Sequence, residues 1–163
     1  MATTRLNKLT VRTEQYSVAE AWQLLEWCVA AGATEFTLRC LATRSSGSQF
    51  CDQVDQTLRA DSQRAAKRPH LSRALNELGI RETKLWILNE HTLKRLRGLV
   101  PAGIFDYAGG RPGGWLENLE VYRDGEILLG VITHEHRAVL FVTDDERDQL
   151  QALHLLQSEP RID

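Results

Sequence analysis

Apolar and polar residues alternate over most of residues 115–143, and this pattern predicts three consecutive antiparallel strands. The alternation is interrupted at 123–126 and again at 133–137, where the two connecting turns are expected. The first interruption contains Asp124 and Gly125, and an Asp-Gly pair accepts the positive φ angles of a type I′ turn. The sequence therefore predicts a tight hairpin followed by a third strand.

The alternation also predicts which side chains share a face of this meander. One face is expected to contain Leu119, Val121, Ile127, Leu129, Val131, Val139 and Phe141. The opposite face is expected to contain Leu128, Ile132, Leu140 and Val142. Since both sets are apolar, other elements should cover the meander on both sides.

Capping signals mark the two clearest helices. Ser17, followed three residues later by Glu20, forms a capping box, and apolar residues then recur at helical spacing. Gly32 supplies the left-handed residue that ends this helix. A second capping box, formed by Thr143 and Glu146, begins a C-terminal helix. The inward-facing residues of that helix should be Leu150, Leu153 and Leu156.

Shorter patterns predict the elements of the N-terminal half. Residues 5–12 are expected to form a short edge strand, and strict alternation over 35–43 predicts a strand with one buried face. A narrow helical stripe predicts a helix within residues 48–61. The stripe consists of Phe50, Val54 and Leu58.

The centre of the chain is predicted to contain two further helices and a strand. Pro69 suits a first helical turn and Gly79 a helix stop, so we expect a helix between them. Its inner face would contain Leu71, Ala74, Leu75 and Leu78. The apolar run 84–88 is typical of a strand near the centre of a sheet, and residues 90–99 have the pattern of another helix.

Together these elements predict one α+β domain that spans residues 1–163. Its sheet should be mixed or antiparallel, with flanking helices and the C-terminal meander of residues 115–143 as its best-defined part. A chain of 163 residues is long enough to bury a core of its own.

The composition is that of a globular protein without a membrane partner. Its apolar runs fall far short of the roughly 20 residues that cross a membrane. Residues 1–8 contain no apolar core, so we expect no secretory signal and a cytoplasmic location. Cys28, Cys40 and Cys51 are an odd number without CxxC spacing, and we interpret them as buried free thiols in a reducing cytosol.

Charge is distributed unevenly along a chain whose formal net charge is −2. Residues 39–100 contain 12 Lys and Arg against 6 Asp and Glu, whereas residues 101–163 contain 5 against 12. A basic segment of this kind can contact nucleic acid. The candidate contacts are Arg64, Lys67, Arg68, Lys94, Arg95 and Arg97. The other interpretation is that basic and acidic surfaces lie side by side in one fold, because the arginines are scattered.

Residues 102–114 form the longest irregular segment and contain five of the eleven glycines. This loop lacks the Gly-Lys-Ser/Thr ending of a P-loop and leads into a strand, so we do not expect it to bind phosphate. The loop and its exit are rich in residue types that dominate protein contacts, and we predict a partner-binding surface. That surface would consist of Phe105, Tyr107, Arg111 and Trp115. Alternatively, these aromatic side chains fold back onto the core.

No stretch of the sequence carries a complete catalytic or metal-binding motif. His134 and His136 lie in a predicted turn with no further ligand nearby, whereas a zinc site needs three or four ligands. We therefore expect no metal, no cofactor and no catalytic residue. Asp61, Glu82 and Lys84 have a nuclease-like spacing that is short enough to arise by chance.

We therefore expect a small cytoplasmic protein that works by binding another macromolecule, in the manner of an inhibitor, immunity protein or adaptor. Another protein is the expected partner, and self-association is compatible with the sequence. One alternative is an enzyme that acts on nucleic acid or a phosphate ester through residues 61–97. Another is a nucleic-acid-binding module that uses the basic segment 39–100.

Overall fold

The fold combines a large antiparallel sheet with helices and a separate β-hairpin. The computed structural model describes residues 6–41, 45–71, 78–101, 103–105 and 115–156. Its elements are β1 (Asn7–Arg12), η1 (Thr13–Gln15), α1 (Val18–Ala30), β2 (Glu35–Leu41), α2 (Ser45–Thr57), η2 (Arg59–Asp61), β3 (Ala66–Leu71), β4 (Leu78–Thr83), β5 (Trp86–Ile87), α3 (Glu90–Leu99), β6 (Trp115–Arg123), β7 (Glu126–Ile132), η3 (Thr133–Glu135), β8 (Arg137–Val142) and α4 (Asp144–Ala152). The large sheet has the strand order β1-β8-β7-β6-β2-β5, and β3 pairs with β4. The predicted α+β class with an antiparallel sheet is confirmed.

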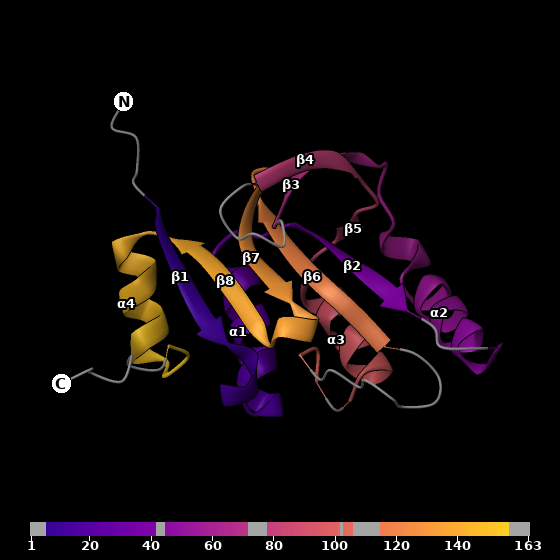
Figure 1. Cartoon of the computed structure of the whole chain (residues 1–163), viewed down its shortest axis with the longest axis horizontal. Coiled ribbons are helices and arrows are strands. Elements are labelled where there is room, and N and C mark those ends of the chain that lie inside the picture. Colours follow the sequence, from indigo (N-terminus) through magenta and orange to yellow (C-terminus); the bar gives the residue numbers. More distant parts are fainter. Residues whose placement is uncertain (1–5, 42–44, 72–77, 102, 106–114, 157–163) are drawn as a thin grey trace.

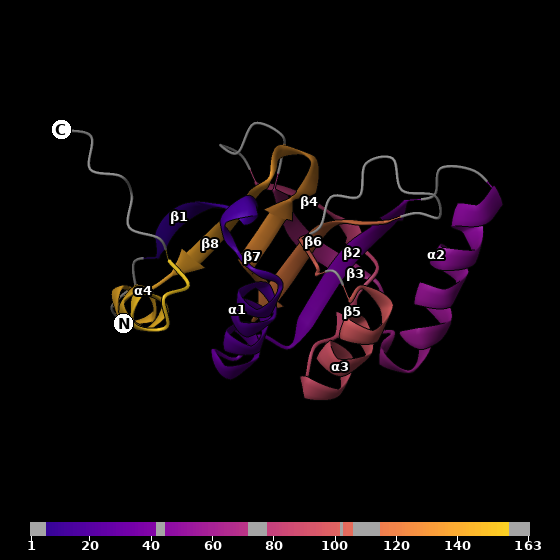
Figure 2. The same cartoon turned by 90° about the horizontal axis from the view of Figure 1, so that it is seen from below.

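Helices and hairpin cover different parts of the large sheet. α1 and α3 lie together on one side of it (Figure 2), and their apolar side chains join those of the sheet in one core. α2 and α4 lie at opposite lateral edges of the sheet, with α2 beside β2 and α4 beside β1 (Figure 1). The hairpin β3-β4 crosses one end of the sheet near β6 and β7, where it covers a second, smaller apolar cluster. None of the described helices has the length and apolar character needed to cross a membrane.

The predicted meander of residues 115–143 is confirmed as β6, β7 and β8. Asp124 and Gly125 have φ angles of 53° and 81°, so the first turn has the two positive values that an Asp-Gly type I′ turn requires. The second turn contains η3 and ends at His136, which has a left-handed φ of 50°. Apolar clusters lie on both sides of the meander, as predicted.

The predicted division of side chains between the two faces is partly wrong. The register shifts so that Val121 pairs with Leu129 while Tyr122 pairs with Ile127. In β8, Leu140 lies opposite Leu129 and therefore on the helix-covered face. The side chains assigned to the wrong face are Ile127, Leu128, Val139, Leu140, Phe141 and Val142. One extra residue in a strand reverses every side chain beyond it, which strict alternation cannot foresee.

The helix predicted to begin at Pro69 is wrong, because its flanks form a β-hairpin. Ala66–Leu71 pair with Leu78–Thr83 through six antiparallel residue pairs. Pro69 is tolerated in β3 because this strand lies at the edge of a two-stranded sheet and can spare one backbone donor. Ala74 and Leu75, central to the predicted helix, lie outside the described residues. Strand pairing here overrides a helical spacing of leucines.

The apolar run 84–88 is an edge segment rather than a central strand. Within it, β5 contains two residues and pairs with the end of β2 at the margin of the sheet. Leu85 is buried in the apolar cluster beneath the hairpin, whereas Trp86 stacks on Phe36 with ring centroids 5.7 Å apart. The segment is apolar because it passes between the hairpin and the main core.

The other predicted elements of the N-terminal and central parts are confirmed. The edge strand is β1, the alternating strand is β2, and helices occupy the positions of α1, α2 and α3. Ser17 and Glu20 form the predicted capping box, in which the Ser17 N–H donates to the Glu20 carboxylate at 2.7 Å. Gly32 follows α1 with a φ of 94°.

The C-terminal helix begins as predicted and ends earlier. Thr143 and Glu146 form its capping box, and Leu150 is fully buried. Leu153, expected to face inward, is 42% exposed. α4 ends before it, and His154 turns the chain with a φ of 57° so that Leu155 is buried instead.

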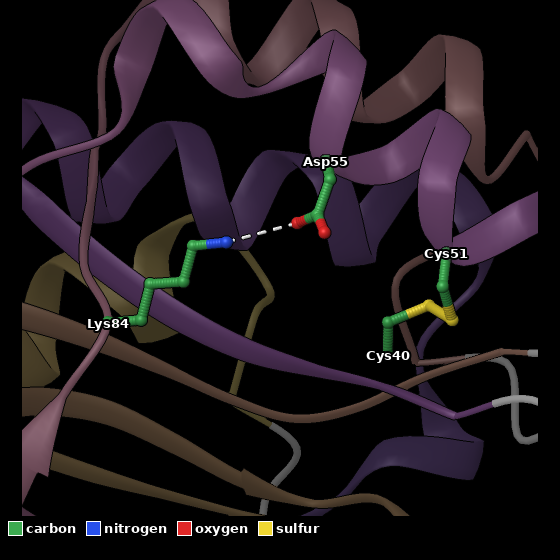
Figure 3. The surroundings of a disulfide bond; sticks show 4 residues. All are labelled: Cys40, Cys51, Asp55 and Lys84. Carbon is green, nitrogen blue, oxygen red and sulfur yellow. Dashed lines mark hydrogen bonds and ion pairs between the residues drawn. A yellow bond between two sulfur atoms is a disulfide. The ribbon is translucent and has the colours of Figure 1, made fainter. Parts of the chain in front are cut away.

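Two of the three cysteines are bonded to each other, so the interpretation of all three as free thiols is wrong. Cys40 of β2 and Cys51 of α2 form a disulfide with a Cα–Cα distance of 5.7 Å (Figure 3). Cys28 is a buried free thiol, as expected, and burial raises its pKa well above the ordinary range. The sequence could not reveal the bond, because it depends on how α2 folds back along β2.

Candidate functional site: a cleft beside the β-hairpin

A cleft of about 910 Å³ lies between the hairpin and the large sheet. Residues 79–84, from β4 and its exit, form one wall, while β2, β6 and β7 supply the floor. Five charged side chains and a histidine from the η3 turn line the cleft above its buried base. They are Arg39, Arg81, Glu82, Lys84, Glu117 and His134.

Glu120 of β6 is the centre of a buried polar network at the base of the cleft. It is 5% exposed, yet both carboxylate oxygens have partners. One oxygen accepts from the Leu71 N–H at 2.8 Å, and the other accepts from the Tyr122 hydroxyl at 3.0 Å and from His70 Nδ1. Burial is the main cause that raises the pKa of Tyr122 far above its ordinary value, so this hydroxyl remains a donor. The network therefore attaches β3 to the large sheet while satisfying a buried charge.

His70 extends this network toward β4. Because its Nδ1 faces the Glu120 carboxylate, Nδ1 carries the proton and Nε2 accepts a hydrogen bond from the Thr83 hydroxyl. Burial is the main cause that lowers the pKa of His70, and Arg81 lowers it further, so that the net shift is downward although the Glu120 carboxylate raises it. The imidazole is therefore neutral at neutral pH, and Thr83, His70 and Glu120 have the order of a nucleophile, a base and an orienting carboxylate.

The sequence analysis expected no such set, because its members belong to three strands far apart in the chain. His70 lay in the segment predicted to be helical, so its side chain could not be placed in contact with Thr83. No local motif surrounds Glu120 either. The hairpin pairing and the docking of β3 on β6 together create the set.

Arg81 lies beside the network as a cation without a described carboxylate partner. One of its terminal nitrogens is 3.3 Å from His70 Nδ1. Since that nitrogen already directs its proton to Glu120, it offers Arg81 no acceptor. Among the residues that the structure describes, no carboxylate forms an ion pair with Arg81. The guanidinium is exposed at the wall of the cleft and is available to an anionic group.

Comparison with protein-family models, curated proteins and solved structures gives no match. Function must therefore be inferred from the geometry of the cleft and its surroundings.

Within the described ranges, no three His, Cys, Asp or Glu side chains gather where they would hold a metal ion. His134 lies 3.9 Å from Glu135, and His136 lies 3.7 Å from Glu14.

Three of the six predicted nucleic-acid contacts are engaged in ion pairs. Arg68 holds Glu35 through three hydrogen bonds between 2.8 and 3.1 Å. Arg95 makes a similar fork to the buried Asp61, with distances between 2.6 and 3.1 Å. Arg97 pairs with Glu26 and lies over the Trp22 ring. The remaining three, Arg64, Lys67 and Lys94, are exposed.

The six residues do not form one patch. Arg64, Lys67 and Arg68 precede or belong to β3, whereas the other three lie on α3, which covers the side of the sheet away from the hairpin. Charge that is concentrated in one part of the sequence is thus divided between two sides of the molecule.

The nuclease-like residues are also separated. Glu82 and Lys84 line the cleft, while Asp61 is buried against Arg95 and does not line it. Lys84 forms an ion pair with Asp55 of α2 at 3.1 Å (Figure 3). Its ammonium also lies 4.9 Å from the centre of the Trp86 ring. Lys84 therefore links the wall of the cleft to α2.

Of the four residues of the predicted loop surface, the structure describes Phe105 in full and Trp115 only as part of a strand. Phe105 is 8% exposed and packs against Tyr16 with ring centroids 5.8 Å apart, so this side chain folds back onto the core. Tyr107 and Arg111 lie outside the described residues. Trp115 begins β6 opposite Leu41, and its side chain also lies outside the description. The loop therefore leads directly into a strand that lines the cleft.

Proposed function

We propose that the protein acts by binding another protein in the cleft beside β4, without catalysing a reaction. The observation that carries this proposal is the wall of the cleft. It is formed by β4, which has one edge without a partner strand in the described part of the chain and presents an exposed apolar and an exposed cationic side chain. Ile80 is 72% exposed, and Arg81 has no described carboxylate partner. Uncovered strands and exposed apolar side chains are features that proteins otherwise avoid or protect.

The predicted loop surface belongs to the same proposal because the chain runs from it into β6, a strand that lines the cleft. β6 begins at Trp115, and Glu117, two residues further on, lines the floor. We therefore keep Tyr107, Arg111 and Trp115 in the proposal as predicted contacts of the partner. Aromatic and arginine side chains in such positions favour tight protein contacts.

A photo-crosslinking experiment tests the proposal. p-Benzoyl-phenylalanine in place of Ile80 should give a crosslinked adduct with one discrete protein in cells of the natural host. The matched control carries the same group in place of Ile87, which is 38% exposed on β5 and does not line the cleft. An adduct of equal yield from both positions, or from neither, would contradict the proposal.

A cytoplasmic location is part of the proposal, and the disulfide provides its test. Reducing pathways of the cytosol keep most thiols unbonded. Rapid alkylation of living cells should therefore label Cys40 and Cys51 in a substantial fraction of the chains if the protein resides there. Complete protection of both from alkylation would place the protein in an oxidising compartment.

A second candidate function is hydrolysis of an ester or amide, favoured by the hydrogen-bonded set of Thr83, His70 and Glu120. His70 Nε2 would accept the hydroxyl proton as the Thr83 oxygen bonds to the carbonyl carbon, and would return that proton to the leaving group as its bond to this carbon breaks. A water molecule, activated by the same nitrogen, would then release the acyl group from Thr83 as the free acid. The wild-type protein should then cleave p-nitrophenyl acetate, and the Thr83→Val variant should not. Equal rates in both proteins would dismiss this candidate.

The nucleic-acid alternatives have weaker support. The ion pairs of Arg68, Arg95 and Arg97 reduce the basic surface available to phosphates, and the burial of Asp61 against Arg95 separates it from Glu82 and Lys84 in the cleft. Fluorescence anisotropy with labelled duplex and single-stranded DNA at low salt provides the check. Binding that falls steeply with salt would restore this class.

A further inference from the structure

We infer that the segment bound in the cleft is an extended peptide that adds a strand to the outer edge of β4, with acidic and apolar side chains in alternation. This inference rests on the proposed function and specifies the chemistry of the partner. Strand addition is a recurrent mode of peptide recognition in which backbone hydrogen bonds provide affinity and alternate side chains provide specificity.

The edge of β4 borders the cleft. In an extended strand, successive side chains point to opposite faces. Gly79, Arg81 and Thr83 occupy one face of β4, whereas Ile80 and Glu82 occupy the other, yet all five line the cleft. A cavity that touches both faces of a strand runs along its edge.

This edge has backbone groups available for pairing. β4 pairs with β3 on one side, and no other strand in the described part of the chain pairs with it. In an antiparallel ladder, alternate residues direct their N–H and C=O groups away from the existing partner. The six residues of β4 therefore carry such groups along an outer edge that borders the cleft. An added strand would satisfy them.

The side chains along the edge specify what the peptide carries. On the face directed at the large sheet, Arg81 presents a guanidinium without a described carboxylate partner, and Arg39 is exposed on the floor. An inward acidic side chain would meet this positive charge, since guanidinium and carboxylate pair with two hydrogen bonds. On the outer face, Ile80 is 72% exposed and would gain an apolar cross-strand neighbour.

The dimensions of the cleft favour a single segment over a second copy of the chain. Its volume of about 910 Å³ is bounded by the hairpin wall and by a floor from the large sheet. Cavities of roughly 300–1,000 Å³ enclose ligands of limited size rather than whole domains. A second hairpin of the same kind would also bring a second Arg81, with the same charge, to the shared edge.

The probe that tests this inference is an acetylated and amidated hexapeptide of alternating valine and glutamate. We expect it to bind the full chain, as measured by fluorescence anisotropy, and to slow hydrogen exchange of the β4 amides. The matched peptide of alternating valine and lysine should bind at least about tenfold more weakly, because it opposes Arg81 with a like charge. Arg81→Glu should reverse this preference without a change in melting temperature.

N-methylation distinguishes strand addition from other binding in the same cleft. Alternate amides of an extended peptide point to the same side, so methyl groups on one alternate set block the pairing edge and those on the other set leave it intact. One methylated hexapeptide should therefore bind like the parent, and the other at least about tenfold more weakly. Equal effects of both sets, or no protection of β4 amides, would overturn the inference.

Different results would reject the protein-binding function and the strand-addition inference. A specific crosslink from position 80 together with no binding of either hexapeptide would reject strand addition and retain the protein-binding function. No crosslink and no peptide binding would reject both. Sedimentation that shows a dimer abolished by Ile80→Asp would assign the edge to a second copy and would also overturn the inference.

Discussion

The two faces of the large sheet are covered in different ways. On the helix side, α1 and α3 bury a continuous apolar core with few polar groups, and it includes Leu129 and Leu140, both fully buried. On the hairpin side, the apolar cluster is small, and β3 is held mainly by the polar network around Glu120. Apolar burial is non-directional, whereas a buried polar network has a defined geometry and responds to pH.

This difference separates the side of the sheet that contributes most to stability from the side that contains the cleft. A vacancy on the helix side should lower the free energy of unfolding strongly, because the core there is close-packed. The hairpin side holds one strand pair at a fixed distance from the sheet and leaves a cleft between them. A surface held by a few directional contacts can open locally without global unfolding.

The largest expected effect comes from truncation on the helix side. Leu129→Ala should lower the free energy of unfolding by about 3 kcal/mol, because it leaves a cavity in a fully buried position. Urea denaturation monitored by fluorescence measures the change. The control Ile80→Ala, at a 72% exposed position, should alter stability by less than about 0.5 kcal/mol. Equal effects of the two variants would remove the distinction between core and cleft.

The next effect concerns α2, which is linked covalently to β2. The Cys40–Cys51 disulfide closes a short loop, and its loss should lower the free energy of unfolding by roughly 2–3 kcal/mol. Thermal unfolding of the wild-type protein with and without a reductant measures this loss. A Cys40→Ser, Cys51→Ser double variant should show the same low stability and no further response to the reductant. A reductant effect that persists in the double variant would point to Cys28 instead.

A smaller effect is expected from the polar network. Glu120→Gln retains the shape of the side chain but replaces a charged acceptor of three hydrogen bonds, and should cost roughly 1–3 kcal/mol. Glu82→Gln, at an exposed position on the wall of the same cleft, is the matched control and should be nearly neutral. A neutral effect of Glu120→Gln would show that other contacts hold the hairpin, among them the ion pair between Arg68 and Glu35.

The polar network also predicts a pH dependence that the helix side lacks. The pKa of His70 is lowered in the folded state, so the unfolded chain binds more protons at mildly acidic pH and stability rises with pH. The contribution is complete above the ordinary histidine pKa of about 6.5 and is lost as the pH falls through the lowered value. Histidine side chains titrate roughly between pH 5 and pH 8. The free energy of unfolding of the wild type should therefore rise with pH in this interval. His70→Gln should flatten the curve in this interval.

Glu146 provides an internal reference for this pH dependence. Hydrogen bonds from Arg123 lower its pKa, so its contribution is also lost as the pH falls, but in the lower range below the ordinary glutamate value of about 4.3. The two transitions should therefore be separable. A His70→Gln variant that keeps the full slope near neutrality would assign that slope to other groups.

The sequence predicted the parts of the fold that local signals determine. Capping boxes at Ser17 and Thr143 and the Asp-Gly turn at 124–125 are confirmed, because each depends on neighbouring residues. The hairpin was missed because Pro69 and the surrounding leucines also fit a helix. Its pairing depends on contacts with β6 and β7 that no local pattern contains.

One contact illustrates why the candidate site could not be predicted. Leu71 of β3 lies against Gly130 of β7, where an added Cβ would come within 2.3 Å of its Cδ1. The absence of a side chain at Gly130 creates room for the hairpin, but the sequence gives Gly130 the appearance of an ordinary strand residue. His70, Thr83 and Glu120 meet only as a consequence of that docking.

Native-state hydrogen exchange of Tyr122→Phe tests most directly whether a polar network holds the hairpin independently of the core. The substitution removes a hydroxyl that donates to Glu120 and keeps the buried ring. We predict that the amides of β3 and β4 exchange roughly fivefold faster, as expected for the loss of about 1 kcal/mol, while those of β7 and β8 are unchanged. Uniform acceleration across both sheets, or none, would contradict the division between an apolar core and a hairpin held by a polar network.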